Sequence, residues 1–234
     1  MEERKQSVRI QTSLFNAAER KLLIRLAERM PEWVTSDMLT FVGFAGAVFI
    51  AAGYALSTIN LNWIWFACFG FLVNWFGDSL DGSLARVRNA QRPVYGFFLD
   101  HNVDCINESI MFIGVGLSPL MSLSCALLVL TAYLLLSVYV YINAHLKNEF
   151  KLTYGGLGPT ELRIIAVIIS LVLLYVKPLR EFSCSFTLMG YEVTLMTLDI
   201  VALVIAVVIL IMYLTSLVKD AREFSIIDPP KKKE

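Results

Sequence analysis

Apolar residues form six long runs along the chain, and short polar segments separate them. Each run approaches the roughly 20 residues that an α-helix needs to cross a bilayer. The second and fifth runs are shorter, and the second is expected to continue as helix through the polar segment Asp78–Arg86. The pattern predicts an all-α integral membrane protein with six transmembrane helices. They are expected near Ser36–Ser57, Trp63–Gly77, Gly96–Leu117, Ser122–Ala144, Glu161–Val176 and Leu195–Leu217.

The residues before the first run have a different, amphipathic pattern. Basic residues lie mostly on one side of a helical wheel. Apolar side chains recur at helical spacing on the other side: Phe15, Ala18, Leu22, Leu26 and Met30. This predicts an amphipathic helix on the membrane surface, with packing of that helix on the protein itself as the alternative. No cleavable signal peptide is expected, because the first 30 residues are charged and lack an apolar core.

Charge adds an orientation to this picture. The formal net charge is zero, but 18 of the 20 Lys and Arg residues fall on one side of the predicted topology. Only Lys177 and Arg180 fall on the other side. Because loops rich in Lys and Arg stay in the cytoplasm, both termini are expected there, which requires an even number of spans. The basic residues thus gather on the cytoplasmic side of the predicted membrane protein. Their distribution does not indicate nucleic acid as a partner.

Four carboxylates lie where the second and third runs meet: Asp78, Asp81, Asp100 and Asp104. Spacings of three and four residues place each pair on one helix face. The segment Val87–Tyr95 between the pairs is polar and contains a proline, so two antiparallel helices joined there would bring all four acids together. Crowded acids cannot all stay ionised without cations. The pattern predicts a site for Mg²⁺ or Mn²⁺ at the cytoplasmic face.

Metal ions held by carboxylates suit displacement at a phosphoryl group. Gly82 and Ala85 are small enough to let a bulky group approach the backbone, and Arg86 can pair with phosphate or with an acid. Phosphate, metal and membrane together favour the joining of a soluble headgroup to a lipid. An ion-pair network of the acids with Arg86 and Arg88 is one alternative. A non-enzymatic cation binder or transporter is another, but the outer halves of the runs offer hardly any polar path.

These residues resemble the signature of the CDP-alcohol phosphotransferase family. The signature reads Asp-x-x-Asp-Gly-x-x-Ala-Arg, a spacer of seven or eight residues, then Gly-x-x-x-Asp-x-x-x-Asp. One departure is the spacer Val87–Tyr95, which has nine residues. An extra residue in the turn would keep the carboxylate geometry, whereas one on a helix would rotate the pairs out of register. All eight signature positions are filled here, by Asp78, Asp81, Gly82, Ala85, Arg86, Gly96, Asp100 and Asp104.

The resemblance implies metal-dependent transfer of a substituted phosphate group from a CDP-linked donor to an alcohol, with release of CMP, in phospholipid synthesis. At least one substrate would be a lipid, and two Mg²⁺ or Mn²⁺ ions and a homodimer are expected. The resemblance makes Asp78, Asp81 and Asp100 metal ligands, and Asp104 a ligand, the general base, or both. It assigns the CDP moiety to Asp81, Gly82, Ala85, Arg86 and Gly96.

Two further residues resemble positions of choline and ethanolamine phosphotransferases. His101 follows Asp100 directly, and Glu161 ends the segment Gly158-Pro159-Thr160-Glu161. A histidine–glutamate couple could remove the proton from the acceptor hydroxyl. Alternatively, His101 only orients Asp100, and Glu161 is a helix first-turn residue that the helix dipole favours. The resemblance favours a CDP-amino alcohol with a lipid acceptor over CDP-diacylglycerol with a small polar acceptor.

Three other polar residues have open interpretations. Arg163 either binds a phosphate of the acceptor or extends to the membrane interface. Glu108 either extends the acceptor pocket or contacts a neighbouring helix, and Asp199 is expected to be structural. The chain is thus divided into a cytosolic amphipathic helix in residues 1–32, a six-helix transmembrane catalytic domain in residues 33–220, and a disordered cytosolic tail in residues 221–234.

Overall fold

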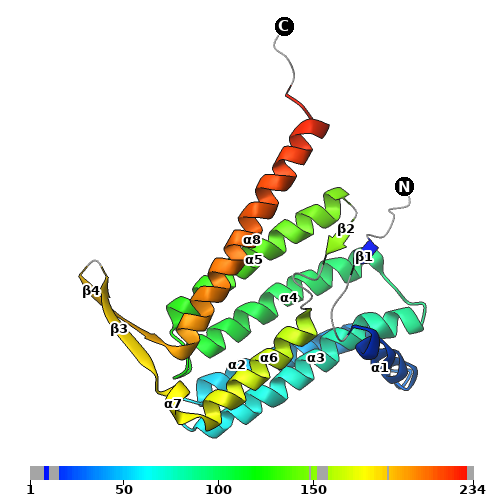
Figure 1. Cartoon of the computed structure of the whole chain (residues 1–234). Coiled ribbons are helices and arrows are strands. Elements are labelled where there is room, and N and C mark those ends of the chain that lie inside the picture. The colour runs from blue at the N-terminus through cyan, green and yellow to red at the C-terminus, as the bar shows by residue number, and fades with distance from the viewer. Residues whose placement is uncertain (1–7, 11–15, 148, 152–157, 189, 231–234) are drawn as a thin grey trace.

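The computed structural model describes residues 8–10, 16–147, 149–151, 158–188 and 190–230 (Figure 1). Helices account for most of them, which confirms the all-α prediction. The helices are α1 Asn16–Glu28, α2 Ser36–Leu56, α3 Ile64–Val87, α4 Pro93–Gly116, α5 Leu123–Lys147, α6 Pro159–Tyr175, α7 Lys177–Arg180 and α8 Thr197–Ile227, with a 3₁₀ turn at Leu61–Trp63. Short strands β1 Val8–Ile10 and β2 Glu149–Lys151 pair in parallel, and β3 Ser183–Leu188 forms a hairpin with β4 Tyr191–Met196.

Each predicted span coincides with one long helix, and the second continues through the aspartate segment as expected. Among the described residues, α2, α5 and α8 have the length and composition to cross a membrane. Helices α3 and α4 carry the aspartates, and α6 is only 17 residues long. The structure therefore supports an integral membrane protein with three candidate spans, and six spans stay a prediction. The hairpin β3–β4 was not expected. Because β4 extends to Met196, the last helix begins at Thr197 and not near Leu195.

Helices α2 and α3 approach so closely that only glycine fits between their backbones. A Cβ at Gly46 would lie 2.3 Å from Asn74 N, and one at Gly77 would lie 2.2 Å from Gly43 N. At the other end of the pair, a Cβ at Gly53 would lie 2.4 Å from a backbone nitrogen of α3. Small residues of this kind allow tight helix packing where lipid gives no hydrophobic driving force. This contact fixes the register of α3, and so the position of its aspartates.

Helix α1 packs on α3 through Leu23 and Ala27, which are both buried. The Glu19 carboxylate accepts hydrogen bonds from Trp75 Nε1 (2.8 Å) and from Thr160 Oγ1 (2.6 Å). Because these donors belong to α3 and α6, one carboxylate of α1 joins three helices. The packing of α1 on the protein, given above as the alternative, is therefore present.

The apolar stripe predicted for this helix is only partly buried. Phe15 lies outside the described residues, Ala18 and Leu22 are exposed, and Leu26 and Met30 are half-buried. The face that packs on α3 is displaced by one position from the predicted stripe. Contact of the remaining apolar side chains with a membrane surface stays a prediction.

Helices α5 and α8 form a second packed pair, which is drawn above α2, α3, α4 and α6 in the view of Figure 1. The Asp220 carboxylate accepts hydrogen bonds from Tyr139 Oη (2.5 Å), Asn143 Nδ2 (2.9 Å) and Lys147 Nζ (3.0 Å). Lys147 also pairs with Glu223 at 2.8 Å. These contacts extend α8 to Ile227, seven residues into the predicted disordered tail, while residues 231–234 lie outside the described part.

Asp199 joins the opposite ends of the same two helices. Its carboxylate is fully buried and accepts hydrogen bonds from both N and Oγ of Ser122, each at 2.8 Å. The other oxygen accepts from Met196 N at 3.0 Å and caps α8. These contacts agree with the structural role expected for Asp199.

Candidate active site

Three aspartates converge between α3 and α4. One carboxylate oxygen from each of Asp78, Asp100 and Asp104 lies within 4.8 Å of the other two. All three side chains are half-buried, so water screens their mutual repulsion only in part. A donor set made of carboxylate oxygens alone suits hard divalent ions such as Mg²⁺ or Mn²⁺. The geometry could hold a metal ion there.

The nine-residue spacer keeps these aspartates in register. Helix α3 ends at Val87 and α4 begins at Pro93, so residues 88–92 form the connection. Asn89 adopts a positive φ of 52° in this turn, and Pro93 is at the helix start that proline favours. Arg88 donates hydrogen bonds to backbone carbonyls of the segment before α2 and so anchors the turn. The extra residue therefore does not separate Asp78 from the aspartates of α4.

Asp81 makes its hydrogen bonds mainly with the start of α2. Thr40 Oγ1 donates a hydrogen bond to Asp81 Oδ2 (2.7 Å), and the backbone N–H of Gly82 donates to Oδ1. Ser36 Oγ donates to the Asp81 carbonyl at 3.0 Å. Within the described part of the chain, the oxygens close enough to share one ion come from the other three acids. The structure thus brings Asp78, Asp100 and Asp104 together, and the start of α2 lies against Asp81; a place for Asp81 among the metal ligands stays a prediction.

Arg163 contributes a positive charge that the sequence analysis had not placed among the acids. Its Nη2 lies 2.5 Å from Asp78 Oδ2, and its Nε donates to Asn74 Oδ1 at 3.0 Å. Asn74 Nδ2 in turn donates to Gly43 O at 2.9 Å. The Arg163 side chain is 19% exposed, so it lies largely between helices. Asn74 precedes Asp78 by four residues, so it shares its helix face and faces the approach to Asp78, one of the two positions that the sequence allowed for it.

The small residues of the signature lie beside open space. A Cβ at Gly96 would meet nothing within 4 Å, and one at Gly82 would meet first the end of the Arg86 side chain, at 3.4 Å. Arg86 is exposed and donates a hydrogen bond to Ser83 Oγ at 3.0 Å, while Ala85 is half-buried. The backbone here is accessible to a flat or bulky group. An ion pair to the acids comes from Arg163, which bonds to Asp78, while Arg88 donates to backbone carbonyls of the segment before α2.

His101 contacts both α4 and α5. It stacks on Phe97 with ring centroids 4.1 Å apart and meets Tyr141 edge-on at 4.5 Å. Its Nδ1 lies 3.6 Å from Asp100 Oδ2, so the ring is beside that carboxylate. Tyr141 carried no sequence motif and was not predicted.

Glu161 has a local structural contact. Its side chain is buried, and Oε2 accepts a hydrogen bond from the backbone N–H of Gly158 at 3.0 Å. This arrangement caps the first turn of α6, as the alternative interpretation expected. The cap fixes the start of the helix that carries Arg163 two residues later.

Glu108 lies one turn beyond Asp104 and faces α5. Its Oε2 is buried and has no hydrogen-bond partner among the residues that the structure describes, and the Tyr133 hydroxyl of α5 lies close to the carboxylate. Of the two predicted roles, contact with a neighbouring helix is therefore present.

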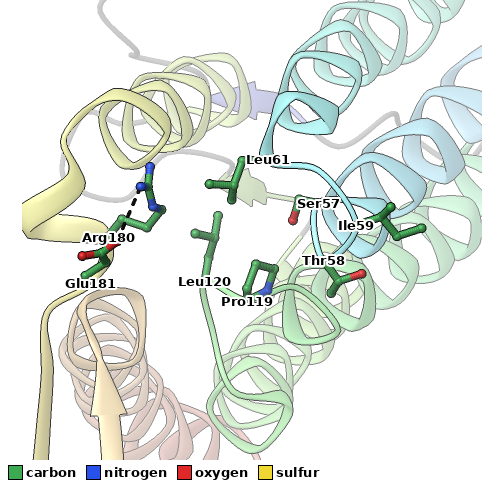
Figure 2. A pocket seen from close by; sticks show the side chains of 8 residues that line it. All are labelled: Ser57, Thr58, Ile59, Leu61, Pro119, Leu120, Arg180 and Glu181. Carbon is green, nitrogen blue, oxygen red and sulfur yellow. Dashed lines mark ion pairs between the residues drawn. The ribbon is translucent and has the colours of Figure 1, made fainter.

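A pocket of about 350 Å³ lies at the other end of the helices (Figure 2). Figure 2 shows Ser57 and Thr58 on one side and Arg180 beside Glu181 on the other. Arg180 Nη1 donates to Leu174 O at 2.8 Å and so caps the end of α6. The pocket contains none of the residues of the signature.

Fold and site together define a helical membrane protein with an acidic, oxygen-rich site at one end of its helices. The chain belongs to the CDP-alcohol phosphatidyltransferase family, whose model matches residues 33–218. Membership confirms the family indicated by the signature and, with it, a membrane transferase of phospholipid synthesis. The family uses a CDP-linked donor and an alcohol acceptor.

Two relatives are similar over parts of the chain. The archaetidylinositol phosphate synthase of Methanothermobacter thermautotrophicus is 28% identical over 154 residues, which cover 66% of this chain and 73% of that protein. The phosphatidylinositol phosphate synthase of Cutibacterium acnes is 34% identical over 84 residues, which cover 36% of this chain and 38% of that protein. Both names refer to inositol phosphate, so the comparisons give no support to the choline and ethanolamine branch that His101 suggested.

Proposed function

We propose that the protein transfers a substituted phosphate group from a CDP-linked donor to an alcohol, with Asp78, Asp100 and Asp104 holding the divalent ions. The observation that carries this proposal is the approach of their oxygens to within 4.8 Å. Asp81, one turn further along α3, is proposed as an additional ligand. When bound, the ions neutralise the diphosphate oxygens of the donor.

The reaction exchanges one bond at phosphorus. The acceptor oxygen attacks the phosphorus distal to cytidine, the bond from that phosphorus to CMP breaks, and the hydroxyl proton passes to a base. Asp104 is proposed as that base, because it lies among the three acids at the deeper position along α4. Contact with Asp100 supports an orienting role for His101, and the cap on α6 supports a structural role for Glu161.

The CDP moiety is proposed to lie over the small residues of the signature. Open space at Gly96, and the exposed end of the Arg86 side chain as the nearest neighbour of Gly82, support room for a nucleotide there. Ala85 would widen the same surface, and Arg86 would pair with a phosphate of the donor.

Our first candidate for the substrate pair is a CDP-linked lipid donor, such as CDP-diacylglycerol, with a small polar acceptor. Support comes from the two relatives, which are both named as synthases of an inositol phosphate lipid. A CDP-amino alcohol with a lipid acceptor, favoured by the sequence analysis, is the second candidate. Its support is the contact of His101 with Asp100.

We further propose six spans, both termini and the acids at the cytoplasmic side, and a homodimer. The Lys and Arg distribution supports the orientation. Arg180, one of the two basic residues assigned to the outer side, lies in the pocket at the far end of the helices from the acids. This position agrees with the proposed orientation.

The experiment is a matrix of CDP-linked donors and alcohol acceptors with the purified protein, read as CMP release and as lipid mass. One donor–acceptor pair is expected to give divalent-dependent CMP release, which Asp100→Asn abolishes. Asp228→Asn, an exposed aspartate after α8, is the matched control and should retain activity. Metal flux in sealed vesicles, without nucleotide turnover, would instead favour a transporter.

A further inference from the structure

Arg163 shares the carboxylate of Asp78 with the proposed metal site. Nη2 of the guanidinium contacts Asp78 Oδ2 at 2.5 Å, and the Asp78 side chain is only 22% exposed. The three acids of the site carry three negative charges when ionised. Arg163 offsets one of them at close range, in a partly buried setting where charges interact more strongly than in water.

The guanidinium is held from its other edge as well. Nε donates to Asn74 Oδ1 at 3.0 Å, and Asn74 Nδ2 donates to the backbone of α2. The buried cap of Glu161 fixes the helix turn from which Arg163 extends. Contacts with α2, α3 and α6 thus hold the positive charge beside Asp78.

We propose that Arg163 is a positioning residue that acts through Asp78 to weaken the affinity of the site for divalent ions. The inference rests on the function proposed above. Two cations that share one carboxylate repel each other, and the affinity of oxygen sites for divalent ions depends on the net charge of their ligands. An arginine held in this position therefore makes the affinity of the site for divalent ions lower than the three acids alone would give. In return, its ion pair joins α6 to α3.

The test measures Mn²⁺ binding to the purified protein in detergent, read as the loss of the free-ion magnetic resonance signal. Arg163→Gln removes the charge, so the apparent dissociation constant should fall by about tenfold, within the range that ligand charge produces. Arg163→Lys retains the charge and should bind Mn²⁺ like the unchanged protein. Without metal, Arg163→Gln should unfold at a lower temperature, since the acids then repel one another, and Mg²⁺ should raise its unfolding temperature more.

Arg180→Gln is the matched control, because the Arg180 side chain is 18% exposed but caps carbonyls at the opposite end of the helices. It should leave Mn²⁺ affinity unchanged even if the fold weakens. Asn74→Ala keeps the charge but removes its anchor at Nε, and it should tighten Mn²⁺ binding by less than Arg163→Gln does. If Arg163→Gln does not purify as a folded protein, Asn74→Ala decides the question.

Equal or weaker Mn²⁺ binding in Arg163→Gln, or in Asn74→Ala where that variant decides, would overturn the inference. Weaker binding in both Arg163→Gln and Arg163→Lys would mean that guanidinium geometry, not charge, matters. Failure of the proposed function looks different. In that case the unchanged protein would show no Mn²⁺ binding that Asp100→Asn removes.

Discussion

Gly77→Ala tests whether the contact of α2 with α3 places the acids. A Cβ at Gly77 would lie 2.2 Å from Gly43 N and 2.5 Å from Leu39 O, whereas real Cβ atoms essentially never approach below 3.0 Å. Both neighbours are backbone atoms, so no side-chain rotation relieves the clash. The two helices must separate by roughly 0.8 Å, the difference between 3.0 Å and 2.2 Å, and such overpacking costs about 1–3 kcal/mol.

Asp78 is the next residue, so it moves with the helix. A displacement of this size in a catalytic arrangement can lower the rate about 10²-fold. We therefore expect Gly77→Ala to lower both the unfolding temperature and, by about 10²-fold, the rate of CMP release per folded protein. Mn²⁺ binding should weaken in parallel.

Gly53→Ala is the control for packing alone. Its Cβ would lie 2.4 Å from Ala67 N, at the other end of the same helix pair. The assay compares CMP release per folded protein with the unfolding temperature for both variants. Gly53→Ala should lose stability and keep most of its activity. Equal loss of activity in the two variants, or full activity in Gly77→Ala, would refute the reasoning.

Three other predictions address the proton, the histidine and the second helix pair. Asp104→Asn should lose about 10²–10⁴-fold in turnover and much less in donor affinity, and an equal fall in donor affinity would mean that it is not the base. His101→Gln should raise the Mg²⁺ concentration for half-maximal activity about 10–100-fold without changing the pH profile, and a changed profile would assign it to proton transfer. Asp220→Asn weakens its charged hydrogen bonds with Tyr139 and Lys147, so it should lower stability by about 1.5–3 kcal/mol in denaturant unfolding and leave CMP release per folded protein intact.

The helices and the approach of Asp78 to Asp100 and Asp104 could be predicted because their signals are local. Apolar runs of sufficient length specify long helices, and spacings of three or four residues place two acids on one face. The polar turn with Pro93 adds the reversal that brings α3 against α4. Even the ninth spacer residue, which the signature did not contain, is accommodated by the turn before Pro93.

The remaining features depend on contacts between segments far apart in the sequence. Asp81 is held by Thr40 because the glycine contact sets the register of α2 against α3, and spacing within α3 carries no information about that register. Arg163 reaches Asp78 across 85 residues of sequence. The face of α1 is displaced because Glu19 accepts hydrogen bonds from two other helices. A search for glycines spaced by seven residues would have found the α2–α3 contact.

The central claim is that aspartates of two adjacent helices hold divalent ions on which cleavage of a nucleotide diphosphate depends. The most direct measurement is CMP release from a CDP-linked donor by the purified protein, with divalent ions removed by a chelator and then restored. Release should stop when the ions are removed and return with added Mg²⁺ or Mn²⁺. Release that continues at the same rate in the ion-free protein would contradict the account.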